Sequence, residues 1–208
     1  MDIQYYGANC TVITTKKARV VIDDNLTDLG QKTVIKDGDI VLFTGVHGDV
    51  PKARLVIGQP GEYEVAGVSV YGYGVRAHMD EEKTKNATMY KLIVDDTRIL
   101  VTGHVYPELS ERQLEEIGTV DIMVVPVGGN GYTTDPIGAL KLIKKIEPKT
   151  IIPTHYADGG LQYPVPQQDL VDALQGLSME PSETLDKLKV KGSELGEGAM
   201  RLVVLNRA

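Results

Sequence analysis

The order of local patterns constrains the fold of this chain most, because strand signals fill the first half and helix signals enter only in the second. Short β-rich runs follow one another and are separated by turn-forming residues such as Asp37-Gly38 and Pro60-Gly61. Spacing this regular favours antiparallel meanders. The predicted strands are Ile3–Tyr6, Cys10–Thr15, Arg19–Ile22, Asp39–Thr44, Arg54–Ile57, Glu62–Ala66, Val68–Val75, Met89–Val94 and Arg98–Val101.

The second half predicts helices with short buried strands between them. Ser110 and Gln113 form a capping-box pattern that opens a helix through Ile117. An N-cap at Asp135, followed by proline, opens an amphipathic helix that ends before Pro148. Residues 170–177 carry a third amphipathic face, and the polar segment 178–199 is assigned no element. The predicted strands here are Asp121–Val125, Thr150–Ile152 and Met200–Leu205.

These patterns predict an α+β fold in which two sheets pack on each other and helices cover them. The 208 residues contain no linker, low-complexity segment or charge block, so we expect a single domain over 1–208. With no Trp and one Phe, the core must consist mainly of Val, Ile and Leu. The basic cluster Lys141, Lys144, Lys145 and Lys149 is interpreted as a solvated helix face.

The net charge and the cysteine content limit which partners and which cellular location we expect for this chain. The net charge of −7 argues against nucleic acid and against an anionic membrane surface as partners. No apolar run approaches the ~18 residues of a membrane helix. Cys10 is the single cysteine, which excludes an internal disulfide and predicts a cytoplasmic location. We expect its thiol to be buried rather than nucleophilic.

All four histidines, His47, His78, His104 and His155, come just after predicted strands, and Asp49 follows His47 by two residues. Imidazole is the commonest metal ligand and the usual general base near neutral pH. A His-x-Asp pair on a turn after a strand could give a divalent ion one nitrogen and one oxygen. Taken singly, each of these histidines is better explained as a surface or structural residue.

Several segments resemble the metallo-β-lactamase fold superfamily, in particular its branch similar to the ascorbate-6-phosphate lactonases. The similarity covers about residues 1–160 and implies a four-layer αβ/βα sandwich. Its most specific part is the stretch from Pro126 to Tyr156. The segments that carry it are Gly7-Ala8-Asn9-Cys10, Val21-Ile22-Asp23-Asp24, Thr44-Gly45-Val46-His47-Gly48-Asp49-Val50, Pro126-Val127-Gly128-Gly129 with Tyr132-Thr133, and Ile152-Pro153-Thr154-His155-Tyr156.

The chain also departs from the family's metal motif. By the resemblance, Gly45 and Val50 replace two ligand histidines, and His104 replaces the bridging aspartate. The resemblance places His47, Asp49, His78 and His155 on or near other ligand positions. It also implies that Asp23 and Asp24 hold the site loop, although they could simply cap a turn.

We therefore predict a metal-dependent hydrolase-like protein that binds one divalent ion, Zn, Mn or Fe. Its ligands would come from His47, Asp49, His78, His104 and His155, with Asp49 as candidate general base. The substrate would be a small ester, lactone or phosphoester. Tyr132 and Tyr156, with Tyr163 and the segment 157–167, are candidate pocket walls. The alternative is a catalytically silent member that binds a small ligand or a partner chain, and the resemblance further suggests self-association.

Overall fold

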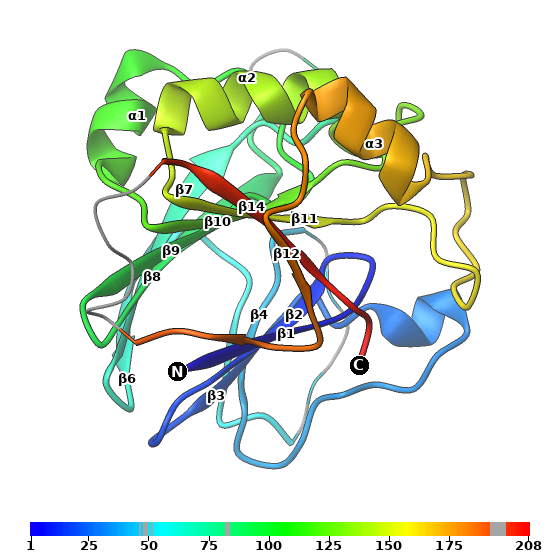
Figure 1. The fold of residues 1–208 in the computed structure, drawn as a ribbon. Coiled ribbons are helices and arrows are strands. Elements are labelled where there is room, and N and C mark those ends of the chain that lie inside the picture. The colour runs from blue at the N-terminus through cyan, green and yellow to red at the C-terminus, as the bar shows by residue number, and fades with distance from the viewer. Residues whose placement is uncertain (46, 48–49, 51, 82–83, 192–198) are drawn as a thin grey trace.

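The computed structural model describes residues 1–45, 47, 50, 52–81, 84–191 and 199–208. Within these residues the strands form two sheets that face each other (Figure 1). One sheet has the order β12-β14-β11-β10-β9-β8-β7-β6. Its strands are β6 Gly61–Val65, β7 Val68–Val75, β8 Ala87–Val94, β9 Thr97–Val101, β10 Ile122–Pro126, β11 Thr150–Thr154, β12 Glu183–Leu185 and β14 Arg201–Leu205.

The second sheet has the order β13-β1-β2-β3-β4-β5. Its strands are β1 Asp2–Gly7, β2 Cys10–Thr14, β3 Arg19–Ile22, β4 Ile40–Leu42, β5 Leu55–Ile57 and β13 Leu188–Lys189. Every predicted strand is therefore present, and no strand end is shifted by more than two residues.

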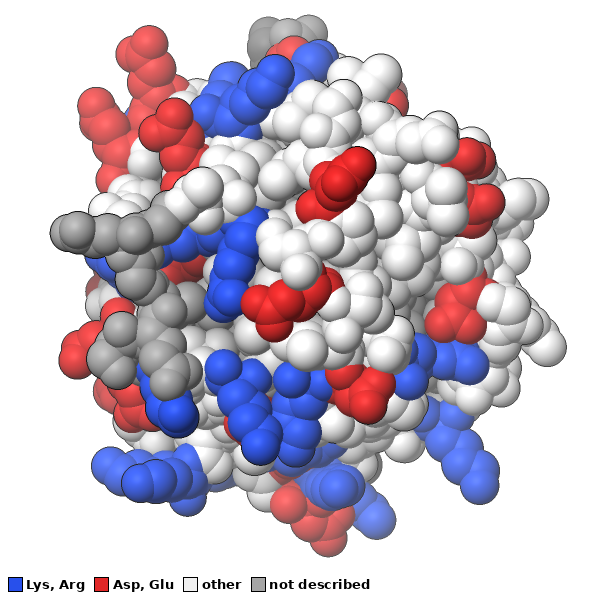
Figure 2. Space-filling model, in the orientation of Figure 1, with Lys and Arg blue, Asp and Glu red and all other residues white. Residues whose placement is uncertain are grey.

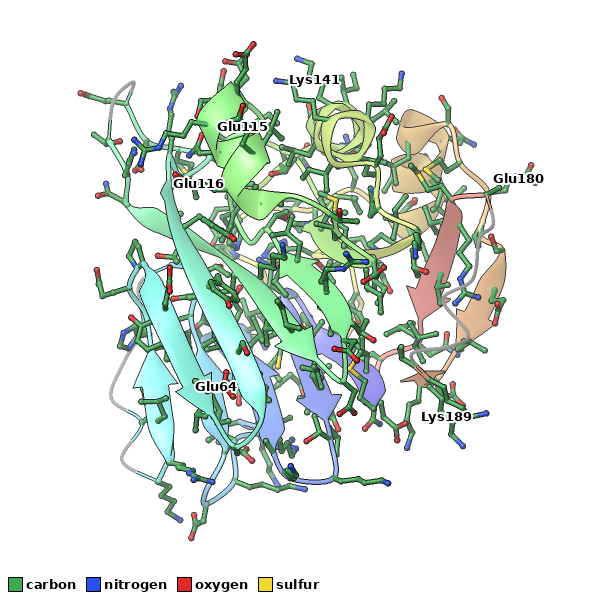
Figure 3. The ribbon with its side chains drawn as sticks, turned by 90° about the vertical axis from the view of Figure 1, so that its left-hand side faces the viewer. Glu64, Glu115, Glu116, Lys141, Glu180 and Lys189 are labelled. Atoms are coloured by element: carbon green, nitrogen blue, oxygen red, sulfur yellow. The ribbon has the colours of Figure 1, made fainter. Side chains whose placement is uncertain are left out.

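The helices α1 Glu111–Ile117, α2 Pro136–Ile146 and α3 Leu170–Leu177 lie together on the outer side of the first sheet (Figure 1). Both predicted N-caps, Ser110 and Asp135, are confirmed, and the structure adds Asp169 as the N-cap of α3. Ser110 forms the full capping box with Gln113, Asp135 accepts from the Gly138 amide, and Asp169 accepts from the Asp172 amide. Figure 3 shows charged side chains of this layer, Glu115 and Lys141, pointing away from the sheet.

The outer face of the second sheet carries a thinner cover than the predicted four layers would suggest. Cys10, Val12, Val21 and Leu26 form a small cluster there, with Val34, Ile35 and Leu161 packed against it. The described cover consists of the 3-10 helix η1 Leu26–Leu29 and neighbouring loop rather than α-helix. Cys10 is fully buried, and burial raises the pKa of its thiol, so the packing interpretation of this cysteine is confirmed.

The antiparallel meanders expected for the first half of the chain are present in some of its strands and absent from others. Strands β1 to β3 and β6 to β9 pair antiparallel. However, β3-β4-β5 and β9-β10-β11-β14-β12 pair in parallel. Helices α1 and α2 connect β9 to β10 and β10 to β11, and such crossovers are what parallel neighbours require. As a result, the carboxyl ends of β9, β10 and β11 meet at one edge.

One apolar cluster joins the facing sides of the two sheets and the inner sides of the helices. Ile3, Ile22 and Leu42 come from the second sheet, and Val70 and Leu92 from the first. Apart from Tyr5, Tyr90 and Met89, its largest fully buried side chains are Ile and Leu, as the aromatic-poor composition predicts. The phenol of Tyr90 is satisfied in this core because it donates to the Phe43 carbonyl at 3.1 Å.

The polar segment 178–199 contains two strands that the sequence pattern missed, β12 and β13. Strand β13 lies at the edge of one sheet and β12 at the edge of the other. A short edge strand can be stable with only one of its sides half-buried. Lys187 and Lys189 belong to this segment, and Arg201 begins the neighbouring strand β14. Figure 2 shows Lys and Arg side chains gathered over the lower part of this face of the molecule. Charged residues on an edge strand oppose pairing with another chain, which accounts for the polar sequence.

Candidate functional site

Three of the four histidines meet at one end of the first sheet. His78 follows β7, His104 follows β9 and His155 follows β11 directly. These strands run in the same direction, since β9 and β11 are both parallel to β10 and β7 is two antiparallel steps from β9. The His78 amide donates to the His104 carbonyl at 2.6 Å, which joins the two loops.

A pocket of about 590 Å³ opens at this end, between the loops of the two sheets. The second sheet supplies residues after β1, β3 and β4, and the first supplies His104, Tyr132 and His155. Most of the residues that line it carry an amide, hydroxyl, carboxylate or imidazole group. The residues that line it are Ala8, Asn9, Asp23, Asn25, Asp28, Leu29, Thr44, Gly45, His104, Tyr132, His155, Gln162 and Pro164.

His104 and His155 form the centre of the pocket wall. Their ring centroids lie 4.7 Å apart in an edge-on arrangement, and the Tyr132 ring lies 5.4 Å from His104 and 5.8 Å from His155. Burial and, as a smaller cause, the nearby His155 lower the pKa of His104 to about 3. Burial also lowers the pKa of His155 to about 4, against the hydrogen bond with Gln167. Both rings are therefore neutral at pH 7 and keep one lone pair each.

The backbone around the pocket is held in conformations that side chains rarely adopt. Ala8, Asp23 and His155 have φ of 47°, 51° and 57°. The His155 amide donates to the Ala8 carbonyl at 2.8 Å, so two of these residues support each other. Left-handed backbone at non-glycine residues costs on the order of 1 kcal/mol or more and is concentrated at functional sites. Three of the nine described non-glycine residues with positive φ therefore line this pocket.

Asp23 ties the two loops of the second sheet together beneath the pocket. Its carboxylate accepts from the Thr44 amide at 2.7 Å and from the Thr44 hydroxyl at 2.6 Å. Burial raises its pKa to about 6, and the Thr44 bonds partly offset that rise. Asp24 instead accepts from the Thr33 hydroxyl and the amides of Val34 and Ile35. Of the two readings left open for this pair, Asp23 holds the site loop and Asp24 fixes the 33–35 turn.

The remaining predicted ligands lie in different places. His47 is exposed, and its ring stacks on Phe43 with centroids 4.8 Å apart and covers the backbone of Gly58. His78 is half-buried, 6.3 Å from the Tyr106 ring by centroids, and its Nδ1 is buried without a hydrogen-bond partner. Neither is among the described residues that line the pocket. Asp49 lies outside the described residues.

The candidate wall tyrosines also separate. Tyr132 lines the pocket, as predicted. The hydroxyl of Tyr156 donates to the Leu205 carbonyl at 3.3 Å, and its ring packs on Tyr5, so this side chain serves the packing behind the wall. The Tyr163 ring lies 5.1 Å from His155, and its hydroxyl donates to the Tyr156 carbonyl at 3.1 Å. Sequence reasoning missed the polar wall residues Asn25 and Asp28, which follow no recognisable motif, and it named Asn9 only as part of the segment Gly7-Ala8-Asn9-Cys10.

The donor set fits a divalent ion only in part. His104 and His155 supply two neutral imidazoles, and His155 is oriented through its second nitrogen, as metal-binding histidines usually are. A catalytic zinc requires three protein ligands. Among the residues with described positions, which exclude Asp49, no group of three or more His, Cys, Asp or Glu could hold a metal ion. The described residues thus give two nitrogen donors and not a complete ligand set.

Facing sheets with outer helices and a polar pocket at the strand ends define the class of protein as a metallo-β-lactamase-type α+β sandwich. Residues 2–155 match the family model described as the beta-lactamase superfamily domain. The match spans most of the chain, and the chain therefore belongs to this superfamily.

Relatives of similar length carry related names. The chain is 24% identical over 196 residues to a UPF0173 metal-dependent hydrolase of Thermus thermophilus, covering 75% of this chain and 84% of that protein. It is 51% identical to a UPF0173 metal-dependent hydrolase of Carboxydothermus hydrogenoformans over only 45 residues, which is 22% of this chain and 20% of the relative.

Solved structures support the fold. The chain is similar to the structure of a candidate Zn-dependent hydrolase of the metallo-beta-lactamase superfamily from Thermotoga maritima. The TM-score is 0.73 at 23% identity, over 99% of this chain and 98% of that one. A metallo hydrolase from Ignicoccus hospitalis gives a TM-score of 0.61 at 16% identity, over 85% and 90% of the two chains. In the part of the chain that the structure describes, no helix is long and apolar enough to cross a membrane.

Proposed function

We propose that this protein is a metal-dependent hydrolase that cleaves a small ester, lactone or phosphoester in the His104–His155 pocket. The observation that carries the proposal is the pair of neutral imidazoles, half-buried His104 and buried His155, that line one pocket at the strand ends. Strained backbone at Ala8, Asp23 and His155 gathers around the same pocket. The names of the relatives from Thermus and Thermotoga support the same reaction class.

The wall residues suit a polar substrate. Asn9, Asn25 and Gln162 offer amide donors and acceptors, and Tyr132 offers a hydroxyl and a ring face. These groups can orient the carbonyl or phosphoryl group of an ester and its oxygen-bearing substituents by hydrogen bonds. When bound, a divalent ion would supply a water whose pKa is lowered towards neutrality. His104 and His155 are its candidate ligands among the described residues.

The first experiment is a metal analysis of the purified chain by elemental mass spectrometry, before and after loading with Zn or Mn. The proposal expects about one ion per chain, together with chelator-sensitive hydrolysis of at least one substrate in an aryl ester, lactone and aryl phosphate panel. His104→Ala and His155→Ala should each remove both. Arg112→Ala, on the exposed side of α1, should change neither.

His47→Ala separately tests the sequence prediction for His47, one of the two predicted ligand histidines that do not line the pocket. If His47 is a ligand, its replacement should lower the metal content as His104→Ala does. Retained metal in His47→Ala together with its loss in His104→Ala would assign the site to the His104–His155 pair. Full metal content in His104→Ala and His155→Ala would refute the proposed site.

A catalytically silent, ligand-binding member of the fold is the second candidate. The observation that favours it is the absence of a three-donor group among the described residues, together with Gly45 and Val50 at positions where the resemblance implies histidines. A chain that takes up no ion under any loading condition and hydrolyses no panel member, yet binds a small polar molecule at the pocket, would establish this alternative.

A further inference from the structure

One buried side chain, Gln167, contacts the His155 ring on the side away from the pocket, and it has no role in the proposed function. The Nδ1 atom of His155 lies 3.1 Å from Oε1 of Gln167. Gln167 is buried, with 8% of its surface exposed, and it comes from the loop before α3. This contact lies behind the pocket wall, because His155 lines the pocket and Gln167 is not among the lining residues that the structure describes.

The orientation of the Gln167 amide is fixed by a second contact. Its Nε2 donates to the Val165 carbonyl at 2.7 Å. A backbone carbonyl can only accept, so the nitrogen of the amide must face Val165 and the oxygen must face His155. An amide oxygen can likewise only accept, and Nδ1 of His155 must therefore carry the proton.

The backbone leaves Gln167 little freedom to turn. A Cβ atom placed on Gly128 would lie 2.3 Å from Oε1 of Gln167 and 1.9 Å from the His155 carbonyl oxygen, so both groups rest against bare backbone. The Gln168 amide donates to the Gly128 carbonyl at 2.9 Å, and the Ala157 amide donates to the Gln168 carbonyl at 2.7 Å. These bonds hold the loop that carries Gln167 against the residues that follow β10 and β11.

We propose that Gln167 is a positioning residue that holds neutral His155 in its Nδ1–H tautomer, so that Nε2 presents the lone pair. The consequence for chemistry rests on the proposed function: Nε2 is then the atom that would bind the ion or accept a proton in the pocket. The Val165 carbonyl determines the orientation of the Gln167 amide, and the Gln167 oxygen determines the tautomer of His155. The geometry therefore predicts that Nε2 of His155 carries no proton.

The test is a long-range proton–nitrogen NMR correlation of the histidine rings in the metal-free, ¹⁵N-labelled chain near neutral pH, with His155 assigned by its loss in His155→Gln. The expected pattern in the unmodified chain is a protonated Nδ1 and an unprotonated Nε2. Gln167→Met removes the acceptor and should move His155 towards the Nε2–H form. Gln167→Glu keeps an acceptor oxygen and should retain Nδ1–H. Gln175→Met, on exposed α3 surface, is the matched control and should change nothing.

Zinc titration of the same variants gives the functional arm. Loss of a residue that orients a metal-binding histidine weakens metal affinity by about 10- to 100-fold, which is the loss expected for Gln167→Met. An Nε2–H ring in the unmodified chain, or an unchanged tautomer in Gln167→Met, would overturn the inference. The unmodified spectrum decides the matter by itself if the variant does not fold. A chain with the expected tautomer that binds no metal would refute the proposed function and leave the role of Gln167 standing.

Discussion

At the scale of single residues, the ionisation of Asp23 in the pocket makes the stability of the fold depend on pH. Burial raises the folded-state pKa of its carboxyl to about 6, against an ordinary value of 3.8. The folded state therefore binds more protons than the unfolded state between these values, and Asp23 costs stability as pH rises through them. The cost grows by about 2 kcal/mol between roughly pH 4 and pH 8.

Asp23→Asn should remove this dependence. Urea unfolding of both proteins across that pH range should show the free energy of unfolding of the natural chain falling relative to that of the variant as pH rises. The comparison is needed because the depressed pKa values of His104 and His155 act in the opposite direction, costing stability as pH falls below about 6.5. A constant difference between the two proteins would show that Asp23 does not titrate abnormally.

Gly103 is a second residue that the site constrains. Its φ is +60°, and a Cβ atom there would lie 2.1 Å from Oγ1 of Thr44, the hydroxyl that Asp23 holds. Gly103→Ala should thus add a steric cost to the backbone cost, with a total of more than about 2 kcal/mol. Gly38→Ala is the matched control, since Gly38 has φ +84° and open space around it. Equal losses in thermal unfolding would mean that the Thr44 contact is unimportant.

At the scale of elements, α1 depends on its cap more than on its surface ion pair. The Ser110 side chain accepts a hydrogen bond from the Gln113 backbone amide, and the Gln113 side-chain oxygen accepts one from the Ser110 backbone amide. Ser110→Ala should cost about 1 kcal/mol of unfolding free energy. Arg112→Ala should cost less than Ser110→Ala, because the Arg112 side chain is 85% exposed and its partner Glu116 is on the same helix. Chemical denaturation compares the two, and a larger loss in Arg112→Ala would contradict the ranking.

At the scale of the whole molecule, the fold should not depend on metal. The apolar cluster that joins both sheets lies away from the pocket, and the pocket loops are fixed by protein contacts such as Asp23–Thr44 and His155–Gln167. Chelation should therefore leave the far-ultraviolet circular dichroism spectrum unchanged and shift Tm only by the linkage effect of losing a ligand, about 2–4 °C for each kcal/mol of that linkage. Cooperative loss of structure on chelation would show that the ion is part of the fold.

Much of this protein can be predicted from local sequence. Alternation and turn residues locate nearly all the strands, and the caps at Ser110 and Asp135 locate two helix starts, because these signals act between residues close in the chain. The aromatic-poor composition predicts an Ile- and Leu-rich core, and the histidine positions after strands indicate where a site would form. The edge strands β12 and β13 escape this reasoning because short, half-exposed strands carry no alternating apolar pattern.

Only the tertiary structure decides which residues share the pocket. His104 and His155 meet because β9 and β11 run parallel on either side of β10, and strand direction depends on crossover connections that periodicity does not encode. His47 stacks on Phe43, and Gln167 reaches His155 from a loop whose sequence has no motif. The sequence by itself determined the elements, the core and the candidate chemistry, since these follow from local propensity and residue type. The arrangement of donors, the strained backbone and the preferred His155 tautomer were decided by contacts between residues far apart in the chain.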